Sequence, residues 1–512
     1  MNLKSFITVS ALLACTAFSV PIPGSAQDIA TQNRKAKHHH YKLIDIGTLG
    51  GPNSSFGVGG YTTKTINSRG TAIAQADTPI PDPYSMIGFD FLVNTPVQWR
   101  NGVLTNLRAL PGVNSGLASW INDHGWVAGF SENGLTDPQT GFPETTAVLW
   151  KDGQIIDLGT LGGNSSGANA VNNRGQVVGG ALNAIPDPFG ATFNQQFIFE
   201  TLPFYFFPVM TQSHAFLWQG GQMQDLGTLG GPDSLAWFVN ESGQVAGQST
   251  MDFIPSPTTG VPTVEVFFWD HGKMIDIGNL GGTFSFVAGL NNRGQMTGTM
   301  NLRGDAIYHA FVWDLGILTD LPTLGGDFGN ANALNDSGEV VGFTSNQGNQ
   351  AVLAYLWSHG MITNLGTVDG DLCSAAHDIN SRGQVVGESS PSCFNSHPVH
   401  AFLWENGGPM VDLNTLVLSG SELQFAGASG INNRGEITGT RALPNGDSHA
   451  FILIPCDEDH SNIEGCDYST VEAGDGAQTP TAQSTATIAT GTSHEHADWQ
   501  NHLRGRKPHG KP

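Results

Sequence analysis

The chain has 512 residues, and its hydrophobic fraction of 39% is sufficient for a sizeable buried core. Asp and Glu outnumber Lys and Arg by 44 to 21, which gives a formal net charge of −23. A charge of this sign and size argues against nucleic acids and anionic membrane surfaces as binding partners.

Residues 1–26 have the features of a secretory signal peptide. Lys4 precedes the apolar run FITVSALLACTAFSV, and the small residues Gly24-Ser25-Ala26 form a cleavage site. The run is too short for a stable transmembrane segment. We therefore expect a secreted protein, extracellular or periplasmic, with no transmembrane segment. The alternative is a lipid anchor at Cys15, because Leu12-Leu13-Ala14-Cys15 resembles a lipoprotein box.

Residues 27–40 form a lead-in to the first repeated segment. The lead-in contains His38, His39 and His40, whose side chains we expect to be solvated, with an adventitious metal site as the alternative.

From residue 41 to residue 455 one sequence unit recurs in eight copies. Each copy contains a stretch that ends in Trp, a stretch that ends in D-L-G, a loop of the type GTLGG, a stretch that ends in N-x-x-G, and a stretch like QVVG. The stretches are short, rich in Val, Ile, Phe and Trp, and bounded by Gly and Asn, which predicts β-strands. An Asn followed three residues later by Gly favours a type I turn that closes a hairpin.

Four short antiparallel strands per copy predict one blade of a β-propeller, so the fold class is all-β. Eight copies predict eight blades, with a seven-bladed ring as the alternative. The first copy begins at its second stretch, YKLIDIGTLGG, and the last copy ends with an unpartnered first stretch, HAFILIP. Pairing these two segments would complete one blade and remove two exposed strand edges.

Three positions identify the copies along the chain. The Trp position, which we expect to pack between blades, is occupied by Trp99, Trp150, Trp218, Trp269, Trp313, Trp357 and Trp404, with Leu453 in the last copy. The Asn of N-x-x-G is Asn67, Asn122, Asn172, Asn240, Asn291, Asn335, Asn380 and Asn432. The second stretch is followed by Asp45, Asn106, Asp157, Asp225, Asp276, Asp320, Asn364 or Asp412, whose side-chain oxygen can accept backbone N–H groups in the turn.

The unit SHAFLW…DLGTLGG…N-x-x-G-x-V-x-G resembles the HAF-repeat family of bacterial extracellular proteins, over about residues 41–455. The His of the His-Ala-Phe signature stands at His214, His309, His400 and His449. Other copies depart from the signature, with Thr95, Thr146, Glu265 and Leu353 in the His position. The resemblance implies secretion and no established activity.

The repeated His residues are not expected to bind a metal, because they stand one per copy on different blades. A hydrogen bond to a neighbouring strand or blade is the better explanation. We predict no catalytic residue, no metal site and no cofactor. The sequence Gly163-Asn164-Ser165-Ser166-Gly167 matches a nucleophile motif, but it lies between two predicted strands rather than before a helix.

Four cysteines follow the signal peptide: Cys373, Cys393, Cys456 and Cys466. An even number in an exported chain favours two disulfides, for which three connectivities exist. Cys373 and Cys393 are expected on the same face of the ring, which favours a bridge between them. Residues 456–512 are predicted to be a disordered low-complexity tail, in which Cys456 and Cys466 close a small loop.

Long insertions between copies provide the candidate binding surface. Two of them share a motif, Ile80-Pro81-Asp82-Pro83-Tyr84 and Ile185-Pro186-Asp187-Pro188-Phe189, and we place all of them in loops that join one blade to the next. Long loops on a rigid scaffold commonly carry recognition residues. The candidate ligand-binding residues are Tyr84, Phe89, Phe91, Asp82, Asp187, Phe189, Phe193, Phe197, Phe204, Tyr205, Phe206 and Phe207.

We therefore predict a secreted, non-enzymatic propeller that binds a glycan or a protein through these loops. One alternative is a polysaccharide hydrolase or lyase that uses carboxylates of the insertions. Another is a structural surface protein whose insertions mediate assembly.

Overall fold

The computed structural model describes residues 37–56, 63–82, 91–112, 115–138, 141–189, 211–393, 399–417 and 424–472. The chain divides into Met1–Lys35, which lies outside these ranges, and a unit from Ala36 onward. The predicted signal peptide, Cys15 and residues 473–512 therefore lie outside the described residues. In the described ranges, no helix is long and apolar enough to cross a membrane.

Among the described residues, the strands from β2 (Tyr41–Asp45) to β33 (Ser448–Pro455) form eight groups of four, and β1 (Lys37–His39) and β34 (Thr470–Glu472) form a separate pair. The first four groups, each given from its inner to its outer strand, are β3 (Ser54–Ser55), β4 (Ala72–Pro81), β5 (Leu92–Arg100), β6 (Val103–Asn106); β7 (Gly116–Ile121), β8 (Val127–Thr136), β9 (Pro143–Lys151), β10 (Gln154–Asp157); β11 (Gly162–Val171), β12 (Val177–Pro186), β13 (Thr211–Gln219), β14 (Gln222–Asp225); and β15 (Ser234–Val239), β16 (Val245–Pro255), β17 (Pro262–Asp270), β18 (Lys273–Asp276).

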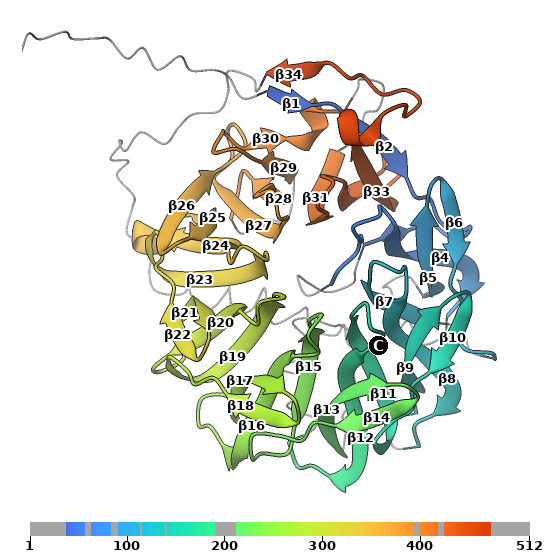
Figure 1. The fold of residues 1–512 in the computed structure, drawn as a ribbon, viewed down its shortest axis with the longest axis vertical. Helices are drawn as coiled ribbons and strands as arrows, with labels where there is room; N and C mark the ends of the chain where they lie inside the picture. The colour runs from blue at the N-terminus through green and yellow to red at the C-terminus, as the bar shows by residue number, and fades with distance from the viewer. Residues whose placement is uncertain are drawn as a thin grey trace, which may run out of the picture. The chain divides into compact units, whose positions relative to one another are not determined.

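The other four groups complete the ring in Figure 1. They are β19 (Gly281–Leu290), β20 (Met296–Leu302), β21 (Tyr308–Asp314), β22 (Ile317–Asp320); β23 (Gly325–Leu334), β24 (Val340–Asn346), β25 (Val352–Ser358), β26 (Met361–Gly366); β27 (Cys373–Ile379), β28 (Val385–Ser390), β29 (His400–Trp404), β30 (Val411–Asp412); and β31 (Gln424–Ile431), β32 (Ile437–Ala442), β33 (Ser448–Pro455), β2 (Tyr41–Asp45). Single-turn 3-10 helices stand at η2 (Gln347–Asn349), η3 (Leu413–Thr415) and η4 (Glu458–His460).

The last group contains strands from both ends of the repeat region. β2 pairs antiparallel with β33, from Tyr41 opposite Pro455 to Asp45 opposite Phe451. This is the predicted pairing of the first and last copies, and it covers the edge of β33. The all-β propeller prediction is confirmed, and the eight groups of described strands accord with the eight copies of the repeat.

The predicted assignment of the connections was wrong in one respect. The GTLGG loops join the outer strand of one blade to the inner strand of the next, as between β10 and β11. The long insertions lie instead in hairpins within a blade, between β4 and β5, β8 and β9, β12 and β13, and β16 and β17. A periodic sequence does not show where a blade begins, because the same repeat can be divided at any connection. Both kinds of connection still lie on one face, which we call the hairpin face.

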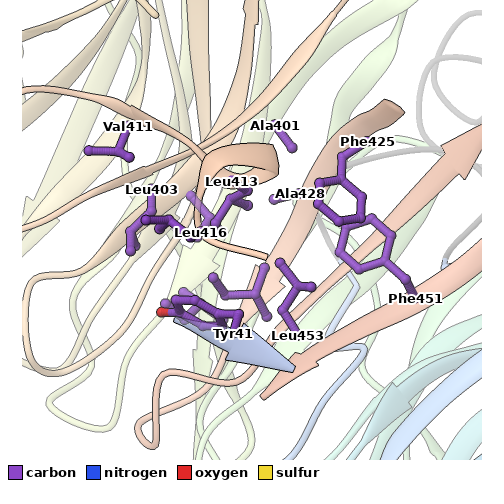
Figure 2. Close-up of a cluster of buried hydrophobic side chains, with 13 residues drawn as sticks. Tyr41, Ala401, Leu403, Val411, Leu413, Leu416, Phe425, Ala428, Phe451 and Leu453 are labelled. Atoms are coloured by element: carbon purple, nitrogen blue, oxygen red, sulfur yellow. The ribbon is translucent and has the colours of Figure 1, made fainter. Parts of the chain in front are cut away.

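Hydrophobic clusters fill the spaces between neighbouring blades. One cluster joins β15 and β16 residues with β19 to β21 residues, and another joins Ala450 and Ile452 of the last blade with Ala72 and Val97 of the first. Figure 2 shows a third cluster, in which Tyr41 of β2 lies with residues of β29 to β33. The predicted packing role of Trp is confirmed for Trp99, Trp150, Trp269, Trp313 and Trp404, which are buried, while Trp218 and Trp357 are half-buried.

The Gly of the QVVG stretch is required by the close approach of the two innermost strands. A Cβ on Gly179 of β12 would lie 2.0 Å from the carbonyl oxygen of Gly167 on β11. No side chain fits at such a distance. Gly at this position therefore allows β11 and β12 to approach each other closely.

A circle of hydrogen bonds joins the eight inner strands at the face opposite the hairpin face. The Asn of each N-x-x-G turn donates from its side-chain nitrogen to the backbone carbonyl of the equivalent Asn in the next blade, at 2.9–3.1 Å. The donors and acceptors, in order, are Asn67, Asn122, Asn172, Asn240, Asn291, Asn335, Asn380 and Asn432, which donates back to Asn67.

The same Asn side chains also shape their own turns. The side-chain oxygen of Asn122 accepts the backbone N–H groups of His124 at 3.0 Å and Trp126 at 2.9 Å. The sequence predicted the turn, and the structure adds the contact between blades.

The segments that flank the repeats are ordered, contrary to the predicted solvated lead-in and the predicted start of the tail at residue 456. β1 (Lys37–His39) pairs with β34 (Thr470–Glu472). His38 is buried, and its Nδ1 lies 2.8 Å from the Glu405 carboxylate. Composition did not reveal this ordering, because it depends on a few specific contacts rather than on a hydrophobic run.

Candidate binding site on the hairpin face

The structure places only part of the predicted ligand-binding set. Phe91 is exposed, Phe189 is half-buried, and Asp82 and Asp187 are buried, so neither carboxylate is placed to meet a ligand directly. The remaining candidates lie outside the described residues: Tyr84, Phe89, Phe193, Phe197, Phe204, Tyr205, Phe206 and Phe207.

Four aliphatic side chains are exposed at equivalent places on four successive hairpins. Each stands two residues before the Asp or Ser that follows the second strand of its blade. They are 55–72% exposed, and they are Ile80, Leu135, Ile185 and Ile254. Phe91 and Phe253 on the first and fourth of these hairpins are also exposed. We call these four aliphatic residues the apolar row.

The sequence of the same hairpins is acidic. Residues 76–94, 131–145, 182–213 and 249–264 contain no Lys or Arg. Their acidic residues are Asp77, Asp82, Asp90, Glu132, Asp137, Glu144, Asp187, Glu200 and Asp252. Of these, Asp252 is exposed and Asp137 is half-buried, whereas Asp77, Asp82, Glu132, Glu144 and Asp187 are buried, and Asp90 and Glu200 lie outside the described residues. The hairpins therefore combine exposed aliphatic groups with an acidic sequence, and sequence reasoning that concentrated on aromatic residues missed this combination.

The buried Asp of the first hairpin attaches that hairpin to the second blade. The hydroxyl of Ser115 donates to Asp82 at 3.0 Å, and the backbone N–H of Ser115 donates to Glu132 at 3.1 Å. Asp82 also donates its backbone N–H to the carbonyl of Phe91 at 2.7 Å, which closes the base of the hairpin. These contacts hold Ile80 in place on the blade boundary.

The third hairpin has the same motif with a different partner. Asp187 lies beside Asp233, which precedes β15 of the fourth blade, and both carboxyl groups are buried. Burial, and after it repulsion from Asp187, raises the pKa of Asp233 well above its usual range, although a hydrogen bond from the Ser213 backbone opposes the change. The sequence shows that two hairpins share one motif. It does not show that Asp187 of this motif lies beside a second acidic residue, Asp233.

The repeated His residues form the predicted kind of contact. The Nδ1 atoms of His214 and His309 lie 2.8 Å from Asp225 and Asp320, the acidic residues at the end of the next strand. His449 lies 3.0 Å from Asp45, so the pair recurs across the joined chain ends. His400 differs, because it contacts Asp371 at 2.9 Å.

The Asp after the second stretch also accepts the predicted turn hydrogen bond. Asp157 and Asp225 each accept the N–H of the Gly two residues later at 2.8 Å. In the copy that has Thr146 in the His position, the Thr146 hydroxyl donates to Asp157 at 2.7 Å instead. The His and Asp positions therefore stabilise the outer strand pair of the blade.

One copy has a second carboxylate in the His position. Glu265 is buried beside Asp276 and accepts a hydrogen bond from the Asn279 side chain. Burial raises the pKa of Glu265 to about 7, with a further contribution from the Asp276 charge. Asn279 replaces the Thr of the GTLGG loop in this copy and supplies the donor that His provides elsewhere.

Two disulfides are present, Cys373–Cys393 and Cys456–Cys466. The first confirms the predicted bridge and ties the start of β27 to the β28–β29 hairpin of the same blade. The second closes the small loop after the last repeat. Within the described ranges, no three His, Cys, Asp or Glu side chains are grouped so that they could hold a metal ion.

No protein-family model and no curated protein sequence matches the chain. Among solved structures, the chain is similar to the β-propeller domain of the trilobed protease from Pyrococcus furiosus, with 9% identity, a TM-score of 0.39, and coverage of 71% of this chain and 97% of that chain. It is also similar to dipeptidyl peptidase 4 from Porphyromonas gingivalis, with 10% identity, a TM-score of 0.41, and coverage of 74% and 55%. TolB from Acinetobacter baumannii shows 10% identity, a TM-score of 0.26, and coverage of 75% and 79%.

Proposed function

We propose that this protein is a secreted, non-enzymatic β-propeller of the HAF-repeat type that binds a partner polypeptide on its hairpin face. The observation that carries the proposal is the apolar row, because four equivalent aliphatic side chains on adjacent hairpins are exposed rather than buried. Exposed apolar groups that are grouped on one surface mark interaction sites. Two disulfides support an extracellular or periplasmic location.

The chemistry of the face favours a positively charged polypeptide with apolar side chains. The four hairpins contain acidic residues and no Lys or Arg, so complementary charge attracts a cationic partner. The exposed large apolar side chains on these hairpins are four aliphatic residues and the two aromatic residues Phe91 and Phe253. Because the aliphatic groups predominate and sugar rings stack on aromatic faces, we favour a polypeptide over a glycan.

The hydrolase alternative is less well supported by the described residues. Glycosidases place two carboxyl groups on either side of an accessible bond. The acid pairs Asp82 with Glu132 and Asp187 with Asp233 are buried under the hairpins instead. These pairs are better explained as contacts that hold the hairpins in place.

A peptide library tests the proposal. The mature protein is screened against random dodecapeptides on phage and, in parallel, on a glycan array. We expect selection of peptides rich in Lys, Arg and apolar residues. Substitution of Ile80, Leu135, Ile185 and Ile254 by Ser should abolish this selection.

The control variant has Ser at four exposed apolar positions on other parts of the surface: Val103, Leu315, Ile317 and Met361. This variant should select the same peptides as the wild type. Equal loss in both variants, or binding only on the glycan array, would contradict the proposed polypeptide partner. Far-ultraviolet circular dichroism verifies that both variants are folded.

A further inference from the structure

Asp187 and Asp233 meet where the β12–β13 hairpin contacts the fourth blade, and they are 3% and 1% exposed. One oxygen of each carboxyl group has a backbone donor: Phe189 donates to Asp187 at 3.0 Å, and Ser213 donates to Asp233 at 2.9 Å. The two Oδ2 atoms are buried without a hydrogen-bond donor, and the charge of Asp187 lies close enough to Asp233 to repel it. Because ionised carboxylates only accept hydrogen bonds and repel each other, a proton on one of the two carboxyl groups would supply the missing donor and remove the repulsion.

No basic group of the surrounding strands neutralises the pair. The elements packed around it are β12, β13, β15 and β16. Their other titratable groups are His214, which contacts Asp225, and Asp252, which is exposed and accepts the backbone N–H of Ile254. A shared proton is therefore the means by which the described residues relieve the repulsion between the carboxyl groups.

The equivalent place under the first hairpin needs no such proton. Ser115 stands seven residues before Asn122, as Asp233 stands seven residues before Asn240. Its hydroxyl donates to Asp82, and its backbone N–H donates to Glu132, so each carboxylate has its own donor. The molecule thus contains, at matching positions, an acid pair whose Oδ2 atoms have no donor and an acid pair that a Ser residue joins through its hydroxyl and backbone N–H groups.

We propose that the Asp187–Asp233 pair is a proton-dependent latch that holds the β12–β13 hairpin, and with it Ile185, against the fourth blade. With one proton between them, the carboxyl groups attract each other and the hairpin is attached. When this proton is lost, two buried negative charges face each other and the attachment weakens. Any effect of the latch on partner binding rests on the proposed function, because it acts through Ile185 of the apolar row.

The direction of the pH effect follows from the raised pKa of Asp233. The attached state holds a proton that the detached state releases at an ordinary carboxyl pKa. Attachment is therefore strongest below the usual carboxyl range and weakens as the pH rises towards the raised pKa. Each pH unit within this window changes the equilibrium by up to about tenfold.

Hydrogen exchange measured by mass spectrometry tests the latch on the full-length mature protein between about pH 5 and pH 9. The readout is the protection of the segment around Ser213 divided by that of the segment around Ser115, which cancels the common effect of pH on exchange. In the wild type this ratio should fall by up to about tenfold per pH unit within the window. In Asp233→Asn and Asp233→Ser it should be constant. A constant ratio in the wild type, or an equal fall in Asp233→Asn, would overturn the latch.

A reciprocal variant and a cation control complete the test. Ser115→Asp places a second acid beside Asp82 and should make the first hairpin pH-dependent. If millimolar CaCl₂ restores protection at high pH in the wild type and not in Asp233→Asn, the pair holds a cation and the proton latch is wrong. Thermal melting verifies the folding of each variant. Because no partner is added, failure of the latch leaves the proposed binding function untouched, and the peptide screen can fail independently.

Discussion

At the scale of single residues, the repeat shows how one structural task is met by different side chains. The acidic residue after the second stretch receives a hydrogen bond from His214 or His309 in some copies and from Thr146 in another. Glu265 differs, because it places a carboxyl group at the position where His or Thr supplies a donor in these copies. This difference should be visible as a pH dependence of stability.

We predict that Glu265→Gln stabilises the protein at high pH and has little effect at low pH. The Glu265 pKa is raised in the folded state to about 7, so its contribution is complete below the ordinary Glu pKa and is lost as the pH rises through about 7. The variant should gain about 1–3 kcal/mol near pH 9, because it removes the repulsion from Asp276. Urea unfolding at several pH values measures this difference. An equal effect of the substitution at all pH values would contradict the assignment.

Sequence patterns identified the His and Asp positions, and they predicted a hydrogen bond for each. They did not show that the two residues bond to each other, because His214 and Asp225 stand on adjacent strands and meet only in the observed register. Asp82 and Asp187 were selected as ligand contacts, but the structure buries both. A motif can repeat because it fixes a hairpin as well as because it binds a ligand.

At the scale of the elements, the N-x-x-G turn performs two separable functions. The side-chain oxygen of Asn291 accepts the backbone N–H groups of Arg293 and Gln295, and its nitrogen donates to the carbonyl of Asn335 in the next blade. The first function shapes the turn, and the second joins two blades. Substitutions at this residue can distinguish them.

We predict that Asn291→Ala lowers the free energy of unfolding by about 2–4 kcal/mol, because it leaves two partly buried N–H groups and one buried carbonyl without partners. Asn291→Asp keeps the acceptor and loses the donor, which bonds both the Asn335 carbonyl and the Gln295 side chain, so its cost should be about half as large. Chemical denaturation of the two variants provides the comparison. Equal destabilisation would mean that the contact between blades, and not the turn, supplies the stability.

At this scale the sequence predicted the strands. For the insertions it predicted the face of the ring but not the strands that they connect. Short apolar stretches bounded by Gly and Asn gave the strands and the face on which the insertions lie. The assignment of the insertions to connections between blades failed, because the strand that ends at Asn122 is the inner strand of its blade and not its third. Only the position of a strand relative to the ring axis decides this order.

At the scale of the whole described unit, closure depends on a strand from the beginning of the repeat region. β2 covers the edge of β33, and Asp45 contacts both His449 and Arg441. The sequence predicted this pairing because the first and last copies are complementary fragments. It did not predict the ordered segment up to Glu472, where His460 contacts Glu436 at 3.2 Å and Asp457 at 2.7 Å.

We predict that deletion of residues 27–46 lowers the melting temperature and causes self-association, because the unpaired edge of β33 becomes available to other chains. Deletion of residues 473–512, which lie outside the described residues, is the matched control. Size-exclusion chromatography with light scattering and thermal melting measure both effects. A monomeric product of unchanged melting temperature after the first deletion would contradict the role given to β2.

The circle of Asn side chains has a direction. In each of its eight bonds the donor belongs to one copy and the acceptor to the following copy. Asn432 of the last copy donates to Asn67 of the first copy, in the same direction around the ring. The circuit is therefore continuous where the covalent chain is open, between β33 and β2. Tyr41 and Pro455 are paired neighbours, so a short linker can join them. A circular permutant cut at any GTLGG loop should then keep all eight bonds, and the present opening is one of several equivalent places to begin the molecule.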